Sequence, residues 1–403
     1  MVGQYGTPEL SAAGFVNNVY NLIIYFLLGM SYASTPVVGN VFGRKDYVET
    51  VQAKRSSVFV NFMTSVFVMG CLYLLYLNIE RLGQPVELMP LIKPYFLILL
   101  VSLPFLSVFN AYKQYYDAIG NTKISMWVML GGNVLNVTLN YILIYGRCGA
   151  PELGLIGAGL ATLISRAAMM IVLMLYRSDN EELNSVRVAW HLGYAKRLTI
   201  LGIPISIQMC LEAGSFNVCA LLMGWIGATA LAAHQVMCSV STIGFMIYYG
   251  IGAAAAILIA QYRGQGNWTE VRAIARTSML MSLVSAVVVS VLICVGCHQI
   301  ASIFTKSDEV ALLFISFLPC FVCYQFGDCL QSIYANCLRA IEDVKLLMLF
   351  AFIAYAVVSV PLAYIFAFPC GMGAIGIWWS FPFGLTTAGL LYYFRFRHST
   401  SST

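Results

Sequence analysis

The sequence predicts an all-α integral membrane protein built from two homologous helical bundles. Of its 403 residues, 60% are hydrophobic and only 10% are charged, whereas soluble globular chains carry about 25% charged residues. The apolar residues gather in long runs, and the second half of the chain repeats the pattern of the first. A chain of this composition needs lipid as the solvent for most of its surface.

Eleven apolar segments are long enough to cross a bilayer, which requires about 20 mostly apolar residues per helix. Each segment must be helical, because lipid cannot satisfy the hydrogen bonds of an open backbone. Prolines inside several of them predict kinks, at Pro36, Pro104, Pro204, Pro361 and Pro382. The expected spans are residues 14–38, 56–78, 94–115, 124–145, 154–176, 199–223, 231–258, 277–297, 310–334, 346–368 and 372–394.

The basic residues predict the orientation of these spans. Of the 22 Lys and Arg residues, 17 fall on one set of alternating loops, including the loop that carries Arg177 and Arg187. The opposite loops hold only Arg81, Lys93, Arg147 and Lys306, and Arg166 lies within a span. Cytoplasmic loops are enriched in Lys and Arg. The C-terminus is therefore expected in the cytoplasm and Met1 on the outer side of an inner membrane.

An internal repeat appears when the chain is shifted by 221 residues. Gly3 then falls on Gly224, and near the ends of the two halves, at a shift of 219 residues, Gly154-Leu-Ile-Gly157 meets Gly373-Ala-Ile-Gly376. The chain is expected to form an N-terminal lobe at 1–190 and a C-terminal lobe at 191–403. Six spans in the second lobe mean that both lobes enter the membrane in the same sense. Parallel repeats of this kind are typical of secondary transporters.

The span at 199–223 has no counterpart in the first lobe, because the shift runs off the start of the chain. The repeat therefore predicts that eleven spans remain of an original twelve, with the first helix missing.

Two acidic residues, Glu212 and Asp328, lie deep inside expected spans. An ionisable group at this depth costs about 2.5–3.5 kcal/mol on insertion scales and usually marks function. Tyr324, Asp328 and Gln331 share one helix face by their spacing, and oxygen ligands suit hard cations. The sequence predicts a cation or substrate site here, with Phe245 as a further aromatic candidate.

The first lobe has a neutral polar set in place of acids. Asn136 and Asn140 lie one helical turn apart, and Thr162 follows in the next span. Amides can also simply join helices by hydrogen bonds, so both a second ion or substrate site and a packing role remain open.

Other chemistries are not supported by the pattern. Most of the twelve cysteines lie in apolar runs, where Cys behaves as a small hydrophobic residue. The sequence Gly371-Met-Gly373-Ala-Ile-Gly376 matches a dinucleotide-binding pattern, but no strand precedes it. We expect no catalytic residues, no nucleotide or nucleic-acid partner and no cofactor.

Several motifs occur in an order that resembles the bacterial multidrug and toxic compound extrusion (MATE) transporters. The segments that carry the resemblance are residues 1–13, Gly202-Ile-Pro204 followed by Glu212, Gly224-Trp-Ile-Gly227, Ala232-Ala-His234-Gln235, and Tyr324 to Gln331 followed by Leu338-Arg339. The resemblance covers the whole chain apart from the family's first helix.

This resemblance implies a secondary transporter that exports cationic or amphipathic drugs by antiport with Na⁺ or H⁺. It also implies that Glu212, Tyr324 and Asp328 form the Na⁺ site of sodium-coupled members, with Phe245 nearby. Asn136, Asn140 and Thr162 match polar positions of the first lobe, although the family often has an acid at the Asn140 position. The alternatives are a lipid-linked oligosaccharide flippase of the same superfamily, an intramembrane enzyme and an inactive truncated copy.

Overall fold

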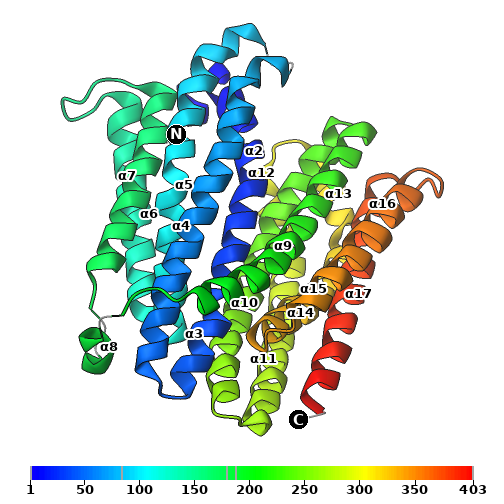
Figure 1. The fold of residues 1–403 in the computed structure, drawn as a ribbon. Helices are drawn as coiled ribbons and strands as arrows, with labels where there is room; N and C mark the ends of the chain where they lie inside the picture. Colours follow the sequence, from blue (N-terminus) through cyan, green and yellow to red (C-terminus); the bar gives the residue numbers. More distant parts are fainter. Residues whose placement is uncertain (1, 83–84, 178–179, 187, 402–403) are drawn as a thin grey trace. The chain divides into compact units, whose positions relative to one another are not determined.

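The computed structural model describes residues 2–82, 85–177, 180–186 and 188–401 (Figure 1). Met1 and Arg187, which entered the orientation argument, lie outside the described residues. The chain divides into two compact units, residues 1–206 and 207–403.

Unit 1 contains the helices that precede the middle of the chain. They are α1 (Val2–Tyr5), α2 (Thr7–Tyr32), α3 (Ser34–Gly43), α4 (Tyr47–Leu77), η1 (Ile79–Leu82), η2 (Val86–Leu88), α5 (Met89–Ala118), α6 (Thr122–Tyr145), α7 (Gly154–Leu175), α8 (Glu181–Ser185) and the first part of α9 (Leu192–Ile226). Within the unit, α5 packs on α4 and α7, and α7 also packs on α6.

Unit 2 begins inside α9. Its further elements are α10 (Ala228–Gly264), α11 (Trp268–Val295), α12 (Cys297–Phe304), α13 (Asp308–Ser316), α14 (Leu318–Ala340), α15 (Val344–Ala351), the π-helical η3 (Phe352–Ser359), α16 (Val360–Ala367) and α17 (Gly373–Ser401). Helix α14 lies against α10 and α17, and its residues 327–329 and 331–340 are all buried.

The eleven expected spans are confirmed. Ten helical stretches of the described chain are long and apolar enough to cross a membrane, and α13 with α14 forms an eleventh when the bent pair counts as one span. The pair bends by 49° at Phe317, just before Pro319, whose ring removes a backbone donor. A break at Ala33 similarly precedes Pro36, and η3 ends just before Pro361.

The division between the compact units falls within α9, between Ser206 and Ile207. The start of α9 is anchored to unit 1 by three side chains. The backbone N–H of His191 donates to Ser56 Oγ at 3.0 Å, Tyr194 donates to Glu49 Oε2 at 2.6 Å, and Ser206 donates to the Phe26 carbonyl at 2.7 Å. The second part of α9 belongs to unit 2.

The sequence repeat has a structural counterpart at two glycines. A Cβ on Gly157 of α7 would lie 2.6 Å from the carbonyl oxygen of Leu143 in α6. A Cβ on Gly376 of α17 would lie 2.6 Å from the carbonyl carbon of Phe366 in α16. Glycines at matching positions of the repeat therefore let α7 pack closely on α6 in unit 1 and α17 pack closely on α16 in unit 2.

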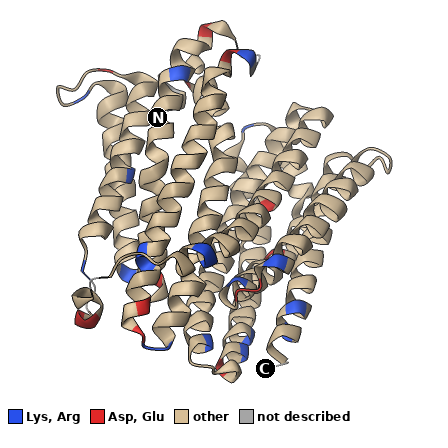
Figure 2. Ribbon diagram, viewed as in Figure 1, with Lys and Arg blue, Asp and Glu red and all other residues tan. Residues whose placement is uncertain are grey.

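Charged residues lie mainly toward the ends of the helices, and the middle of the helices is largely uncharged (Figure 2). This arrangement is the one that a hydrocarbon environment favours, because a charge at the bilayer centre is costly.

Candidate functional site: a linked pair of acids

Glu212 lies in α9, where it is partly buried. Its Oε2 accepts hydrogen bonds from Gln208 Nε2 at 2.9 Å and from Gln331 Nε2 at 3.1 Å. Gln208 precedes Glu212 by one helical turn, whereas Gln331 comes from α14. Both amides stabilise charge on the carboxylate, so Glu212 is held as an oriented acceptor.

Asp328 lies in α14 with only 1% of its surface exposed. Ser332 Oγ lies 3.4 Å from Asp328 Oδ1 and 3.2 Å from Gln331 Oε1. Within the described chain, Asp328 Oδ2 has no hydrogen-bond partner. A buried carboxylate oxygen without a partner is expensive, so Oδ2 is an acceptor that a proton or cation could stabilise.

Gln331 connects the two acids. Its amide nitrogen donates to Glu212, and its carbonyl oxygen accepts from the hydroxyl that also lies near Asp328. The spacing of Asp328 and Gln331 predicted their shared face, and the structure brings Glu212 to that face from α9. The predicted site residues Glu212, Asp328 and Gln331 are thus in one network.

Tyr324 belongs to the same buried core, with 4% of its surface exposed. Its ring makes edge contacts with Trp378 and Phe381 of α17, at centroid distances of 6.1 and 6.3 Å. These contacts fix the ring one turn before Asp328 on α14.

Two residues of this network were not identified from the sequence. Gln208, which is fully buried, accepts a hydrogen bond from Arg339 Nη2 and donates to Glu212. Arg339, expected in a basic loop, instead lies in the last turn of α14 with 5% exposure. The i, i+4 spacing of Gln208 and Glu212 was a usable signal, but the pairing with Arg339 had none.

Two further tyrosines were also missed. Tyr355 of η3 and Tyr392 of α17 are buried, and within the described residues neither hydroxyl has a hydrogen-bond partner. Both lie within electrostatic range of Glu212, and Tyr355 also lies within range of Asp328. A π-helical turn such as η3 is often found at a functional site.

Phe245 does not join this network. Its ring packs against Tyr249 of the same helix, with centroids 5.6 Å apart. The neighbouring Gly244 faces α14, because a Cβ there would lie 2.7 Å from Gln325 Nε2. Phe245 is rotated by about 100° from that direction, so its side chain points to a different side of α10.

The polar candidate residues of unit 1 form hydrogen bonds within their own helices. Asn140 donates to Asn136 at 3.0 Å along α6, and Thr162 donates to the Ala158 carbonyl of its own helix at 3.0 Å. These bonds favour the packing role for the three residues. Arg166 of α7 instead donates to Ser102 Oγ of α5 at 2.6 Å.

The donor set at the acid pair suits a hard cation or protons. Among the described residues, no three His, Cys, Asp or Glu side chains gather as they would at a transition-metal site. Two carboxylates with amide and phenol oxygens are instead hard ligands, as alkali and alkaline-earth cations prefer.

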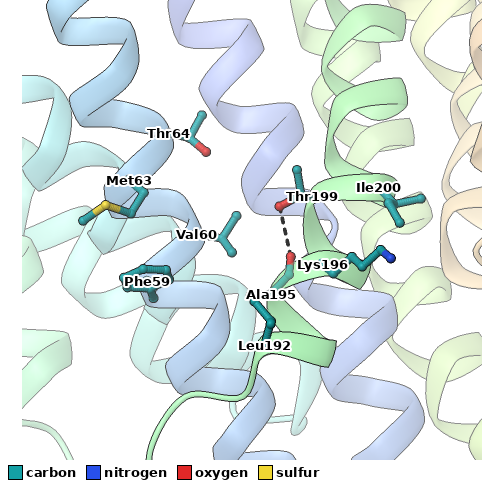
Figure 3. A pocket seen from close by; sticks show the side chains of 9 residues that line it. All are labelled: Phe59, Val60, Met63, Thr64, Leu192, Ala195, Lys196, Thr199 and Ile200. Atoms are coloured by element: carbon teal, nitrogen blue, oxygen red, sulfur yellow. Dashed lines mark hydrogen bonds between the residues drawn. The ribbon is translucent and has the colours of Figure 1, made fainter.

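A separate pocket of about 460 Å³ lies between α4 and α9 in unit 1 (Figure 3). It is lined mainly by apolar atoms, and the Lys196 side chain extends away from the α4 residues. The lining residues are Phe59, Val60, Met63, Thr64, Leu192, Ala195, Lys196, Thr199 and Ile200. None of the predicted site residues is among them.

Comparison with known proteins agrees with this architecture. The family model MatE matches residues 1–142 and 204–365. A probable multidrug resistance protein NorM of Bradyrhizobium diazoefficiens is 31% identical, over 98% of this chain and 87% of its own length. The multidrug resistance protein NorM of Vibrio vulnificus is 28% identical, over 97% of this chain and 88% of its own length.

Solved structures show the same fold. The eukaryotic MATE transporter AtDTX14 superposes with a TM-score of 0.88 at 19% identity, covering 100% of this chain and 91% of that one. The matched family model, the near full-length relatives and the eleven apolar spans lead to one assignment: the chain is a multi-span membrane protein that belongs to the MATE family of transporters.

Proposed function

We propose that the protein exports organic cations or other amphipathic drugs by antiport with Na⁺ or H⁺. The observation that carries the proposal is the pair of acids inside the membrane-spanning helices, Glu212 and Asp328, which are linked through Gln331 and Ser332. The names of the relatives, which are multidrug resistance proteins, support the substrate class.

The acid pair provides the coupling. The open Asp328 Oδ2 and the oriented Glu212 carboxylate favour a bound cation, because an uncompensated charge at this depth is costly. A coupling ion and a cationic drug compete for the same carboxylates, so binding of one favours release of the other. Alternating access of the two lobes then turns this competition into export.

The same carboxylates accept either coupling ion. In the Na⁺ case, Glu212, Tyr324 and Asp328 supply oxygen ligands. In the H⁺ case, the two acids carry the protons. The hydrogen bonds through Gln331 then make the protonation of one acid depend on that of the other. The charge pattern of the loops supports a place in the bacterial inner membrane with a cytoplasmic C-terminus.

A lipid-linked oligosaccharide flippase is the second candidate. Such a protein needs several cations deep in the membrane to hold a pyrophosphate. In unit 1, Arg166 is engaged with Ser102, and in unit 2, Arg339 is engaged with Gln208. This arrangement favours the drug antiporter.

The test is dye efflux from proteoliposomes under imposed Na⁺ or pH gradients. Asp328→Asn and Glu212→Gln should each abolish gradient-driven efflux while the protein stays in the membrane at its usual level. Glu309→Gln is the matched control, since Glu309 is exposed at the start of α13 and its change removes the same charge. Efflux at the normal rate by the double amide variant would contradict the proposal.

A further inference from the structure

A second pocket of unit 1, of about 500 Å³, lies near the start of α4 and the ends of α5 and α7, beside the short α8. It is distinct from the acid pair, which belongs to unit 2. The lining residues are Val51, Lys54, Arg55, Val58, Tyr112, Met174, Tyr176, Arg177, Leu183, Asn184, Ser185 and Val186. We call these residues the basic pocket.

The basic pocket contains three cations, Lys54, Arg55 and Arg177, and no acidic residue among its lining. Arg55 and Arg177 are exposed. Among the described residues, neither guanidinium forms an ion pair with a carboxylate. The pocket therefore offers two free guanidinium groups to an incoming anion.

Lys54 is held in place by aromatic rings. Its Nζ lies 4.4 Å from the centroid of the Tyr115 ring and 5.4 and 5.3 Å from those of Tyr112 and Tyr116. Cation–π contacts of this kind stabilise the ammonium without neutralising it. The Lys54 ammonium group is consequently positioned in the wall of the pocket.

The remaining lining has two characters. Asn184 and Ser185 add an amide and a hydroxyl, while Val51, Val58 and Met174 add apolar surface. A guanidinium pair with polar neighbours is suited to a phosphate group, which Arg binds through two parallel hydrogen bonds. The apolar side chains suit the glycerol and upper acyl region of a lipid.

The position of the pocket points to the source of that phosphate. The basic pocket lies near the ends of helices that are long and apolar enough to cross a membrane, and the ends of such helices are where headgroups are expected to meet water. Basic pockets between such helices bind anionic headgroups. We propose that the basic pocket binds the phosphate of an anionic phospholipid, and that this lipid ties α4, α5 and α7 to α8.

This proposal is independent of the transport activity, so its test uses binding and stability. The variant carries Arg55→Gln and Arg177→Gln. The matched control carries Arg276→Gln and Arg397→Gln, which removes two exposed arginine charges from unit 2. Substitutions of exposed residues outside packed contacts have small effects on stability, so both variants should fold in phosphatidylcholine alone.

The measurement is lipid retention by native mass spectrometry and the thermal midpoint in detergent, with added phosphatidylglycerol, phosphatidylcholine or inorganic phosphate. The wild type and the control should retain phosphatidylglycerol and gain a saturable rise in midpoint, as a ligand of the folded state produces. The pocket variant should lose both effects. Equal retention and equal shifts in the pocket variant and the control would overturn the proposal. An equal rise with inorganic phosphate alone would also overturn it, because the ligand would then be a soluble anion.

Discussion

Each unit contains a close glycine contact between two of its helices, and these two contacts lead to a prediction for stability. Gly157→Ala places a methyl group 2.6 Å from the Leu143 carbonyl oxygen, and Gly376→Ala places one 2.6 Å from the Phe366 carbonyl carbon. These distances are roughly 0.8 Å below the 3.4 Å of an ordinary contact, and the obstacle in each case is backbone. Overpacking of this kind costs about 1–3 kcal/mol. For a unit of this size that cost lowers the thermal midpoint by about 2–12 °C.

The assay is the loss of monodisperse protein after heating in detergent, followed by size-exclusion chromatography. Gly131→Ala is the control, because nothing lies within 4 Å of the added Cβ and Gly131 is also inside α6. Removing a glycine from an open helical position stabilises by about 0.5–1 kcal/mol, so the control should move in the opposite direction. The reasoning would be refuted if Gly157→Ala and Gly376→Ala melted at or above the midpoint of Gly131→Ala.

Two further predictions concern the cation site. Tyr324→Ala should raise the Na⁺ or H⁺ concentration needed for half-maximal dye efflux more than Leu330→Ala does, because Leu330 packs against α17 rather than facing Asp328; equal shifts would remove Tyr324 from the site. Tyr355→Phe should keep or raise the thermal midpoint, since it deletes a buried hydroxyl without a partner in the described chain, and should weaken the dependence on the coupling cation. Tyr364→Phe, on an exposed face of the same span, should do neither, and a stabilised Tyr355→Phe protein with normal cation dependence would show that the hydroxyl is a bystander.

The spans and the repeat could be predicted because each depends on a local rule. About 20 apolar residues must form a helix in lipid, and the eleven segments read this way all appear as helical spans. Gly157 and Gly376 fall at matching positions of the repeat because the same close helix crossing must be made twice.

The network of the candidate cation site could be predicted in part. Glu212 and Asp328 stand out because acids are rare at membrane depth. The spacing of Tyr324, Asp328 and Gln331 gives their shared helix face. Phe245 shows the limit of such reasoning, because its presence in a small-residue span did not fix the direction of its ring.

The sequence by itself determined the membrane environment, the number of spans, the two-fold repeat and the two acids, because hydrophobicity, helix length and buried charge act on neighbouring residues. Only the tertiary structure decided how α9 divides between the units and which partners the acids receive. Gln331 meets Glu212 across 119 residues, and Arg339 meets Gln208 across 131. Such pairings depend on the rotation and depth at which two helices pack, and no local pattern in either helix specifies them.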